Sequence, residues 1–130
     1  MGKIKALYLN VKSGEFPRVI ELDADGCNLD LFYELLDCDC IDIVLRPICG
    51  RKYYVICDDE YLLKPIDPVP ALLFRGERNM SVYGNVILAV PGNPGTDRDF
   101  GSMTADDVLH VTKRLCYSSM GERTSYCIVV

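Results

Sequence analysis

Arginine, asparagine and tyrosine side chains around one irregular stretch are the residues of this chain with the clearest chemistry. They are Arg75, Arg78, Asn79, Tyr83, Asn85 and Tyr54, with Tyr53 and Tyr61 as further aromatic neighbours. Guanidinium groups bind phosphate through two parallel hydrogen bonds, and tyrosine rings offer stacking faces. The pattern predicts a pocket for a small anionic ligand. The alternative is that Arg75 and Arg78 pair with Glu77 and other acids at the surface.

Histidine and cysteine would support a different chemistry, that of a small Cys/His hydrolase. His110 is the only histidine. Its neighbours in a predicted helix, among them Asp106, Asp107 and Arg114, predict a solvated side chain. The motifs G-x-S-x-G, H-E-x-x-H and G-x-x-x-x-G-K-[ST] do not occur in the sequence. The sequence therefore favours a protein without catalytic residues over an enzyme.

The cysteines raise the question of disulfides and metal. They number seven: Cys27, Cys38, Cys40, Cys49, Cys57, Cys116 and Cys127. An odd count argues against a closed disulfide framework, so most are expected to be reduced, buried and small apolar residues. Cys57 is expected to point into a sheet and Cys49 to lie in a turn. The spacing from Cys38 to Cys57 does not match a zinc ribbon, and the acidic runs lack the ligand order of a calcium loop. No metal and no cofactor is expected.

Size and charge limit the remaining classes. The chain has 130 residues, with 19 acidic and 14 basic side chains and a net charge of −5. This length suits one domain over residues 1–130. A negative balance disfavours duplex nucleic acid, which requires a basic face. No stretch resembles a signal peptide or a membrane span, so a cytoplasmic protein without membrane contact is expected.

The first half of the chain predicts two hairpins separated by a helix. Residues 4–10 and 17–22 form the first hairpin, and residues 41–45 and 52–57 form the second around Gly50, with Pro47 bounding the earlier strand. The helix begins at the N-cap Asn28 and ends near Asp37. Its apolar stripe consists of Leu29, Phe32, Tyr33 and Leu36.

The second half is interrupted by Pro65, Pro68 and Pro70. Residues 71–74 are predicted as a short helical turn or covering segment, 86–90 as a central strand and 91–95 as a loop. A helix follows the N-cap Thr104 with Asp107 at N3, a capping box. Its expected inner face consists of Val108, Val111, Thr112 and Leu115. The apolar tail within residues 118–130 is expected to be an interface strand of a homo-oligomer. The predicted class is α+β, a mixed and mostly antiparallel sheet with two helices packed on it.

Several segments together resemble a family of small proteins catalogued as a domain of unknown function, the DUF3846 group. The resemblance rests on residues 5–9, 17–21, 29–36 and 42–44, and above all on 84–90 followed by 99–108, an apolar strand and then a loop that enters a helix. Members of this group occur in phages, plasmids and gut Firmicutes. The resemblance implies a mobile-element accessory protein located in the host cytoplasm.

Accessory proteins of this kind often inhibit or tune host systems, and several unrelated ones sequester host nucleotide signals. The leading hypothesis is therefore a non-catalytic inhibitor of host defence that binds and sequesters a nucleotide-type signal. The first alternative is a protein–protein module that blocks a host enzyme through its acidic face and an exposed strand edge. The second alternative is the Cys/His hydrolase.

Overall fold

The computed structural model describes residues 3–10, 17–23, 28–59, 72–75, 80–82, 85–92, 100–120 and 123–129. For 72–75, 80–82, 117–120 and 123–129 the description is limited to the main chain. The predictions for Arg78, Asn79, Tyr83, Tyr61, the three prolines of residues 65–70 and residues 93–95 lie outside these ranges.

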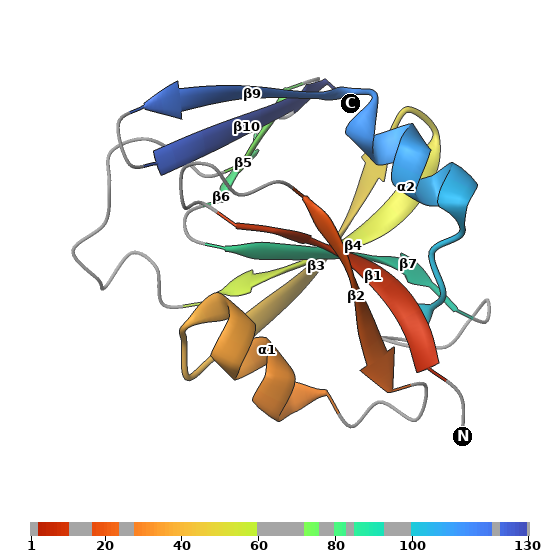
Figure 1. Ribbon diagram of the computed structural model, residues 1–130, viewed down its shortest axis with the longest axis vertical. Coiled ribbons are helices and arrows are strands. Elements are labelled where there is room, and N and C mark those ends of the chain that lie inside the picture. Colours follow the sequence, from red (N-terminus) through yellow and green to blue (C-terminus); the bar gives the residue numbers. More distant parts are fainter. Residues whose placement is uncertain are drawn as a thin grey trace.

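A six-stranded antiparallel sheet forms the centre of the molecule (Figure 1). Its strands are β1 (Lys3–Leu9), β2 (Arg18–Asp23), β3 (Ile41–Ile48), β4 (Arg51–Asp58), β7 (Val86–Pro91) and β8 (Phe100–Gly101). The order across the sheet is β2-β1-β7-β4-β3, and β8 pairs with β7. Both predicted hairpins and the central place of the apolar strand are therefore confirmed.

A second sheet of four strands lies beside one end of the first (Figure 1). It contains β5 (Leu72–Arg75), β6 (Met80–Val82), β9 (Leu115–Met120) and β10 (Arg123–Val129), in the order β6-β5-β10-β9. β10 runs parallel to β5 and antiparallel to β9. The predicted α+β class and the mostly antiparallel pairing are confirmed, but the strands form two sheets.

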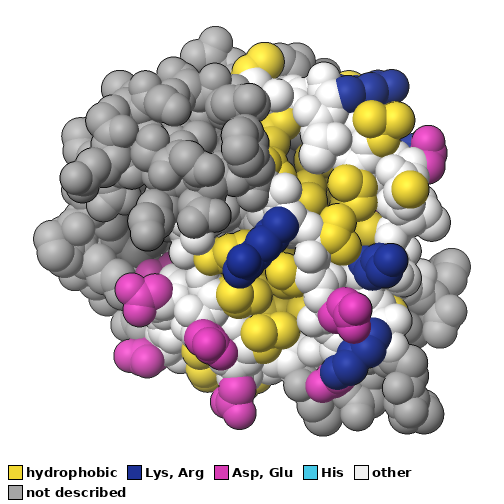
Figure 2. Space-filling model, in the orientation of Figure 1, with side chains coloured by type: hydrophobic (Ala, Val, Ile, Leu, Met, Phe, Trp, Pro, Cys, Tyr) yellow, Lys and Arg dark blue, Asp and Glu magenta, His cyan; other side chains and the backbone are white. Residues whose placement is uncertain are grey.

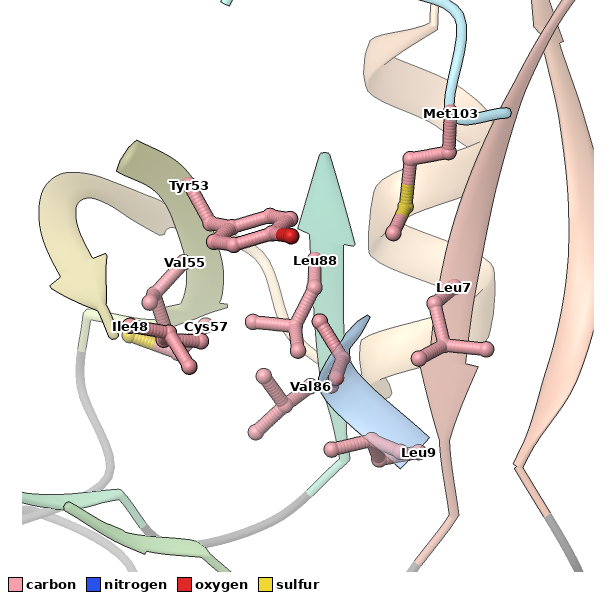
Figure 3. Packing of buried hydrophobic residues seen from close by; sticks show 10 residues of the cluster. Leu7, Leu9, Ile48, Tyr53, Val55, Cys57, Val86, Leu88 and Met103 are labelled. Atoms are coloured by element: carbon pink, nitrogen blue, oxygen red, sulfur yellow. The ribbon is translucent and has the colours of Figure 1, made fainter. Parts of the chain in front are cut away.

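The two helices cover opposite faces of the six-stranded sheet (Figure 1). Helix α1 (Leu29–Leu36) covers a core that includes Phe32, Leu36 and Ile87. Helix α2 (Ala105–Thr112) covers a core that includes Leu88 and Val111. Figure 3 shows Leu88 in this core together with Val86 and Met103. Successive residues of a strand point to opposite faces. A central strand covered on both sides is therefore apolar at every position, as in β7 and in the second half of β1.

Several predicted elements need correction. The predicted strand 41–45 continues through Pro47 to Ile48, because β3 is an edge strand, where a proline without an N–H is tolerated. Cys49 and Gly50 both have positive φ, +46° and +85°, which forms a type I′ turn between β3 and β4. The segment 71–74 was predicted as a helical turn or covering segment, but residues 72–75 form the strand β5. Strands β6 and β8 were not predicted, because each has only three or two residues.

The helix caps differ in how well they were predicted. Thr104 and Asp107 form the expected capping box, with Asp107 N–H donating to Thr104 Oγ1 at 3.1 Å and Thr104 N–H donating to Asp107 Oδ2 at 2.9 Å. Asn28 stands at the N-cap position of α1 but makes no side-chain cap bond. Its amide instead pairs with both main-chain groups of Asp23, which joins β2 to the start of α1.

The apolar tail that was expected at an interface is β10, and it lies between β5 and β9 of its own chain. Leu115, expected on the inner face of the last helix, is the first residue of β9 because α2 ends at Thr112. Among the residues that the structure describes, no helix has the length and apolar character needed to cross a bilayer.

Candidate functional site

Only two of the predicted ligand-binding residues have described side chains, and they lie apart. Asn85 stands just before β7, whereas Tyr54 lies opposite Ala89 near the middle of β4. Four strand residues separate these levels, which is about 13 Å along the sheet. The Tyr54 ring packs edge-on against Phe100, with centroids 5.4 Å apart. Arg75 closes β5 in the second sheet, opposite Val129. The predicted grouping of these residues therefore stays a prediction.

Asn85 belongs to a polar network where β1 ends and β7 begins. Its side-chain amide donates to Tyr8 Oη at 2.9 Å and to the carbonyl of Leu35 at 3.0 Å. Asn10 also donates to Tyr8 Oη, at 3.3 Å, and the Tyr8 hydroxyl donates to Leu35 O at 2.9 Å. The network satisfies a carbonyl in the last turn of α1, where helix carbonyls lack intrahelical partners. It fixes α1 to the sheet.

Arg18 lies beside this network. It is opposite Tyr8 in the β1–β2 register, and its guanidinium carbon is 5.0 Å from the centroid of the Tyr8 ring. The Arg18 side chain is exposed, and within the described part of the chain no carboxylate pairs with it. Tyr8, Asn10, Arg18 and Asn85 are together called the Asn85 end of the sheet.

Acidic side chains lie near the same end, at the start of β3 and the end of β4 and in the residues next to them. The exposed carboxylates there are Asp39, Asp42 and Asp59, and Asp58 is buried. The pKa of the Cys57 thiol is raised to about 12, first by burial and then by the negative charges of Asp42, Asp58 and Asp59. Cys57 therefore stays a neutral thiol and reports a negative potential at this position.

At the opposite end of the sheet, charged side chains of β4 and α2 bind each other. Arg51, at the start of β4, donates through Nη2 to Asp106 at 2.8 Å and through Nη1 to Asp107 at 3.3 Å. The contact with Arg51 holds the pKa of Asp106 below its usual range. Arg51, Tyr53, Asp106, Asp107 and His110 are together called the Arg51 end. Its contacts attach α2 to the β3–β4 hairpin.

The prediction that His110 is solvated is wrong, because only 9% of this residue is exposed. Its Nε2 lies 2.8 Å from the carbonyl oxygen of Ile48. A carbonyl only accepts, so Nε2 carries the proton and Nδ1 accepts from Arg114 at 3.3 Å. The ring also stacks on Tyr53, with centroids 6.0 Å apart. Both ring nitrogens are engaged, which leaves neither for a thiol.

Tyr53 is the largest fully buried side chain of the described residues. Its ring lies across the α2-side core, with the hydroxyl turned toward Leu88 (Figure 3). No hydrogen-bond partner of the hydroxyl is found among the described residues. Burial raises the pKa of Tyr53, and Asp107 adds to this effect, while Arg51 and Arg114 oppose it. Tyr53 is therefore a core residue of the Arg51 end and does not offer its ring to a ligand.

The cysteines are less buried than expected. Cys38 and Cys57 are buried and Cys49 lies in a turn as predicted, but Cys40, Cys49 and Cys116 are exposed. No disulfide joins any of these five within the described ranges. In the described ranges no three histidine, cysteine or acidic residues are grouped so that they could hold a metal ion.

The fold and these two ends define an α+β protein in which one end is held by ion pairs and the other displays the exposed guanidinium of Arg18 and exposed carboxylates. The family model described as Domain of unknown function (DUF3846) matches residues 4–116, and the chain belongs to this family. No curated protein and no solved structure matches the chain.

Sequence reasoning did not select Arg18 as a binding residue or His110 as a core residue. Arg18 lies opposite Tyr8 because of the register of the first hairpin. The sequence alone does not determine that register, because the loop between the two strands does not fix it. The inner face of α2 is rotated from the expected one and includes His110 with Val111. A polar residue next to an apolar one in a short helix carries no signal for burial.

Proposed function

We propose that this protein is a non-catalytic binding protein that sequesters a small anionic ligand of nucleotide type, in the manner of a mobile-element accessory protein that inhibits host defence. The observation that carries the proposal is the guanidinium of Arg18. It is exposed and stacked over the Tyr8 ring, and in the described ranges it has no acidic partner.

A guanidinium held against an aromatic ring is already oriented, so less side-chain entropy is lost when it binds. The N–H groups of the guanidinium can donate two parallel hydrogen bonds to two oxygens of a phosphate. The predicted binding residues Arg78, Asn79 and Tyr83 precede Asn85 by at most seven positions in the sequence. In the sequence, the stretch that contains these predicted binding residues thus leads directly to Asn85.

The environments of His110 and Cys57 favour binding over hydrolysis. A Cys/His hydrolase needs an imidazole that can take a proton from a thiol. Both nitrogens of His110 are already bonded, to Ile48 and Arg114. The buried thiol of Cys57, with a pKa of about 12, is a poor nucleophile at neutral pH.

A second candidate function is docking to a basic surface of a partner protein. It is favoured by the exposed Asp39, Asp42 and Asp59, for which the described part of the chain records no cation partner. Figure 2 shows further acidic side chains over α1. Complementary charge of this kind accelerates association and selects partners.

Calorimetric titration and thermal shift with cyclic and linear nucleotides test the first function. The wild type should be stabilised by at least one nucleotide, since a ligand that binds only the folded state raises its stability. Arg18→Ala should abolish the shift, and Arg18→Lys should retain only part of it, because lysine keeps the charge but not the planar fork. Lys52→Ala, an exposed position on β4 toward the other end, serves as the control and should change nothing. Absence of any shift at about millimolar nucleotide would refute sequestration, since binding that weak is not specific recognition.

The same titration with a lysine-rich peptide tests the second candidate. Binding that is lost in Asp39→Asn/Asp59→Asn but kept in Arg18→Ala supports docking to a basic partner. Binding that is unaffected by the two asparagine substitutions excludes this acidic surface.

A further inference from the structure

We propose that β3 is the surface through which two copies of the chain associate, by antiparallel pairing of β3 with the partner's β3 around a two-fold axis at Val44. β3 is the last strand in the order of the six-stranded sheet, and in the described ranges no strand pairs with its outer side. An edge of this kind is a template for another strand. This inference goes beyond ligand binding and does not depend on it.

Alternate residues of β3 direct their main-chain hydrogen-bonding groups away from β4, as such pairing requires. Asp59 N–H donates to the carbonyl of Cys40 at 3.0 Å, one residue pair beyond the β3–β4 register. Hydrogen-bonded and non-hydrogen-bonded pairs alternate along an antiparallel ladder. The even-numbered residues of β3 therefore direct their main-chain groups toward β4, and the odd-numbered residues direct theirs outward. The outward positions are Ile41, Ile43, Leu45 and Pro47. Pro47 thus lacks its N–H on the outer side, at one end of the edge.

The side chains of β3 are self-complementary in one register. With the axis at Val44, Asp42 lies opposite the partner's Arg46, and Arg46 lies opposite the partner's Asp42. Ile43 lies opposite the partner's Leu45 as a hydrogen-bonded pair, and Val44 meets the partner's Val44. Opposite charges and apolar pairs across strands are both stabilising. The pairing buries Leu45, which is 44% exposed in the single chain.

Other two-fold registers lose this match. Residues directly opposite each other share a face of the sheet, and a two-fold axis keeps each residue on its face. Opposite residues are therefore separated by an even number of positions. Axes at Ile43 or Leu45 set Asp42 opposite the partner's Val44 or the partner's Ile48 and leave its charge unpaired.

The other edge of the six-stranded sheet, β2, has no such register. Its charged residues are Arg18, Glu21 and Asp23. Arg18 is an odd number of positions from both acids, so no two-fold pairing sets it opposite either of them. The apolar tail, for which an interface was expected, lies inside the second sheet as β10. The geometry therefore favours β3 as the self-association surface.

Sedimentation and light scattering over a concentration series measure the association. The wild type should be a dimer. Asp42→Arg sets like charges opposite each other at two sites and should raise the dissociation constant about tenfold or more. Asp42→Arg/Arg46→Asp exchanges the pair and should restore the dimer. Glu21→Arg on β2 makes the same kind of charge change at an exposed site and should leave the dimer intact.

A wild type that is monomeric at about 0.1 mM overturns the proposal, since edge pairing weaker than that has no use in a cell. So does an Asp42→Arg variant whose dissociation constant equals that of the wild type. Arg46 is partly buried, and if the double variant does not fold, Leu45→Asp decides instead. It changes an exposed side chain at the apolar contact and should dissociate the dimer while the circular dichroism of the chain stays unchanged.

Discussion

The Arg51 end and the Asn85 end of the same sheet use arginine in opposite ways. At the Arg51 end, the guanidinium bonds to Asp106 and Asp107 and holds α2 against a hairpin. At the Asn85 end, the guanidinium of Arg18 lies over Tyr8 and meets no carboxylate of the described residues. The charges of the Arg51 end are paired within the chain, whereas Arg18 has no acidic partner among the described residues and is the group that we propose to contact a ligand.

The difference also appears in the buried groups near each end. Tyr53 and His110 stack in the core of the Arg51 end, and the histidine bonds to main chain and arginine. Cys57, near the Asn85 end, lies in the field of three carboxylates. Substitutions at the Arg51 end should therefore change mainly stability, whereas substitution of the exposed Arg18 at the Asn85 end should change mainly the proposed recognition.

The largest expected effect comes from Tyr53→Ala. Removing a fully buried aromatic side chain leaves a cavity and should lower the free energy of unfolding by about 3–5 kcal/mol in urea denaturation. Tyr53→Phe is the control, because it removes only a hydroxyl without a described partner. This variant should stay within about 1 kcal/mol of the wild type, on the stabilising side. A large loss in Tyr53→Phe would show that the hydroxyl has a partner.

His110→Ala should cost about 2–3 kcal/mol, because the buried carbonyl of Ile48 loses its donor and Tyr53 loses its stacking partner. Thermal or urea unfolding measures this loss. His110→Gln keeps a donor and should recover part of it. If His110→Ala were as stable as the wild type, the two ring contacts would not anchor α2.

Asp107→Ala should cost about 1–2 kcal/mol, because it removes both the capping box of Thr104 and one contact of Arg51. Asp59→Ala, an exposed acid near the other end, is the matched control. It should change the free energy of unfolding by less than about 0.5 kcal/mol. Equal losses in the two variants would remove the contrast between the ends.

The smallest expected effect is a pH dependence that comes from Cys57. Its pKa is about 12 in the folded chain and has a reference value of 9.0. Above pH 9 the unfolded chain releases this proton while the folded chain keeps it, so the free energy of unfolding falls as pH rises. Between about pH 8 and about pH 10, the wild type should lose about 1 kcal/mol more than Cys57→Ala does.

Alkylation of the native protein gives an independent check of the same thiol. Cys40, Cys49 and Cys116 are exposed and should react at neutral pH, whereas Cys57 should react only after unfolding. Rapid modification of Cys57 in the folded chain would contradict both its burial and its raised pKa.

Much of the six-stranded sheet could be predicted because its signals are local. Alternation in residues 4–10, the turn at Gly50 and the capping box of Thr104 and Asp107 each specify an element over a few residues. The continuation of β3 through Pro47 was missed because tolerance of proline depends on the strand being at an edge. The second sheet was missed because β5 is defined by its pairing with β10, which lies more than fifty positions further along the chain.

The site was less accessible to sequence reasoning than the fold. Asn85 was selected, but its amide ties Tyr8 to the end of α1. The sequence did not indicate Arg18 as a binding residue, because the orientation of its side chain depends on the Tyr8 ring opposite it in the β1–β2 register. Burial of His110 depends on which side of a short helix meets the sheet. Each of these features depends on how the strands and helices pack against one another, which the residue types alone do not show.

The place of β10 between β5 and β9 has a consequence for the order of assembly. All strands of the six-stranded sheet lie between residues 3 and 101, so that sheet can form while a growing polypeptide is still emerging from the ribosome. The second sheet lacks β10, the strand that joins β5 to β9, until residue 129 has been made. During synthesis, β5 and β9 each therefore have an unpaired edge until β10 has formed. This is the stage at which the nascent chain is most exposed to mispairing.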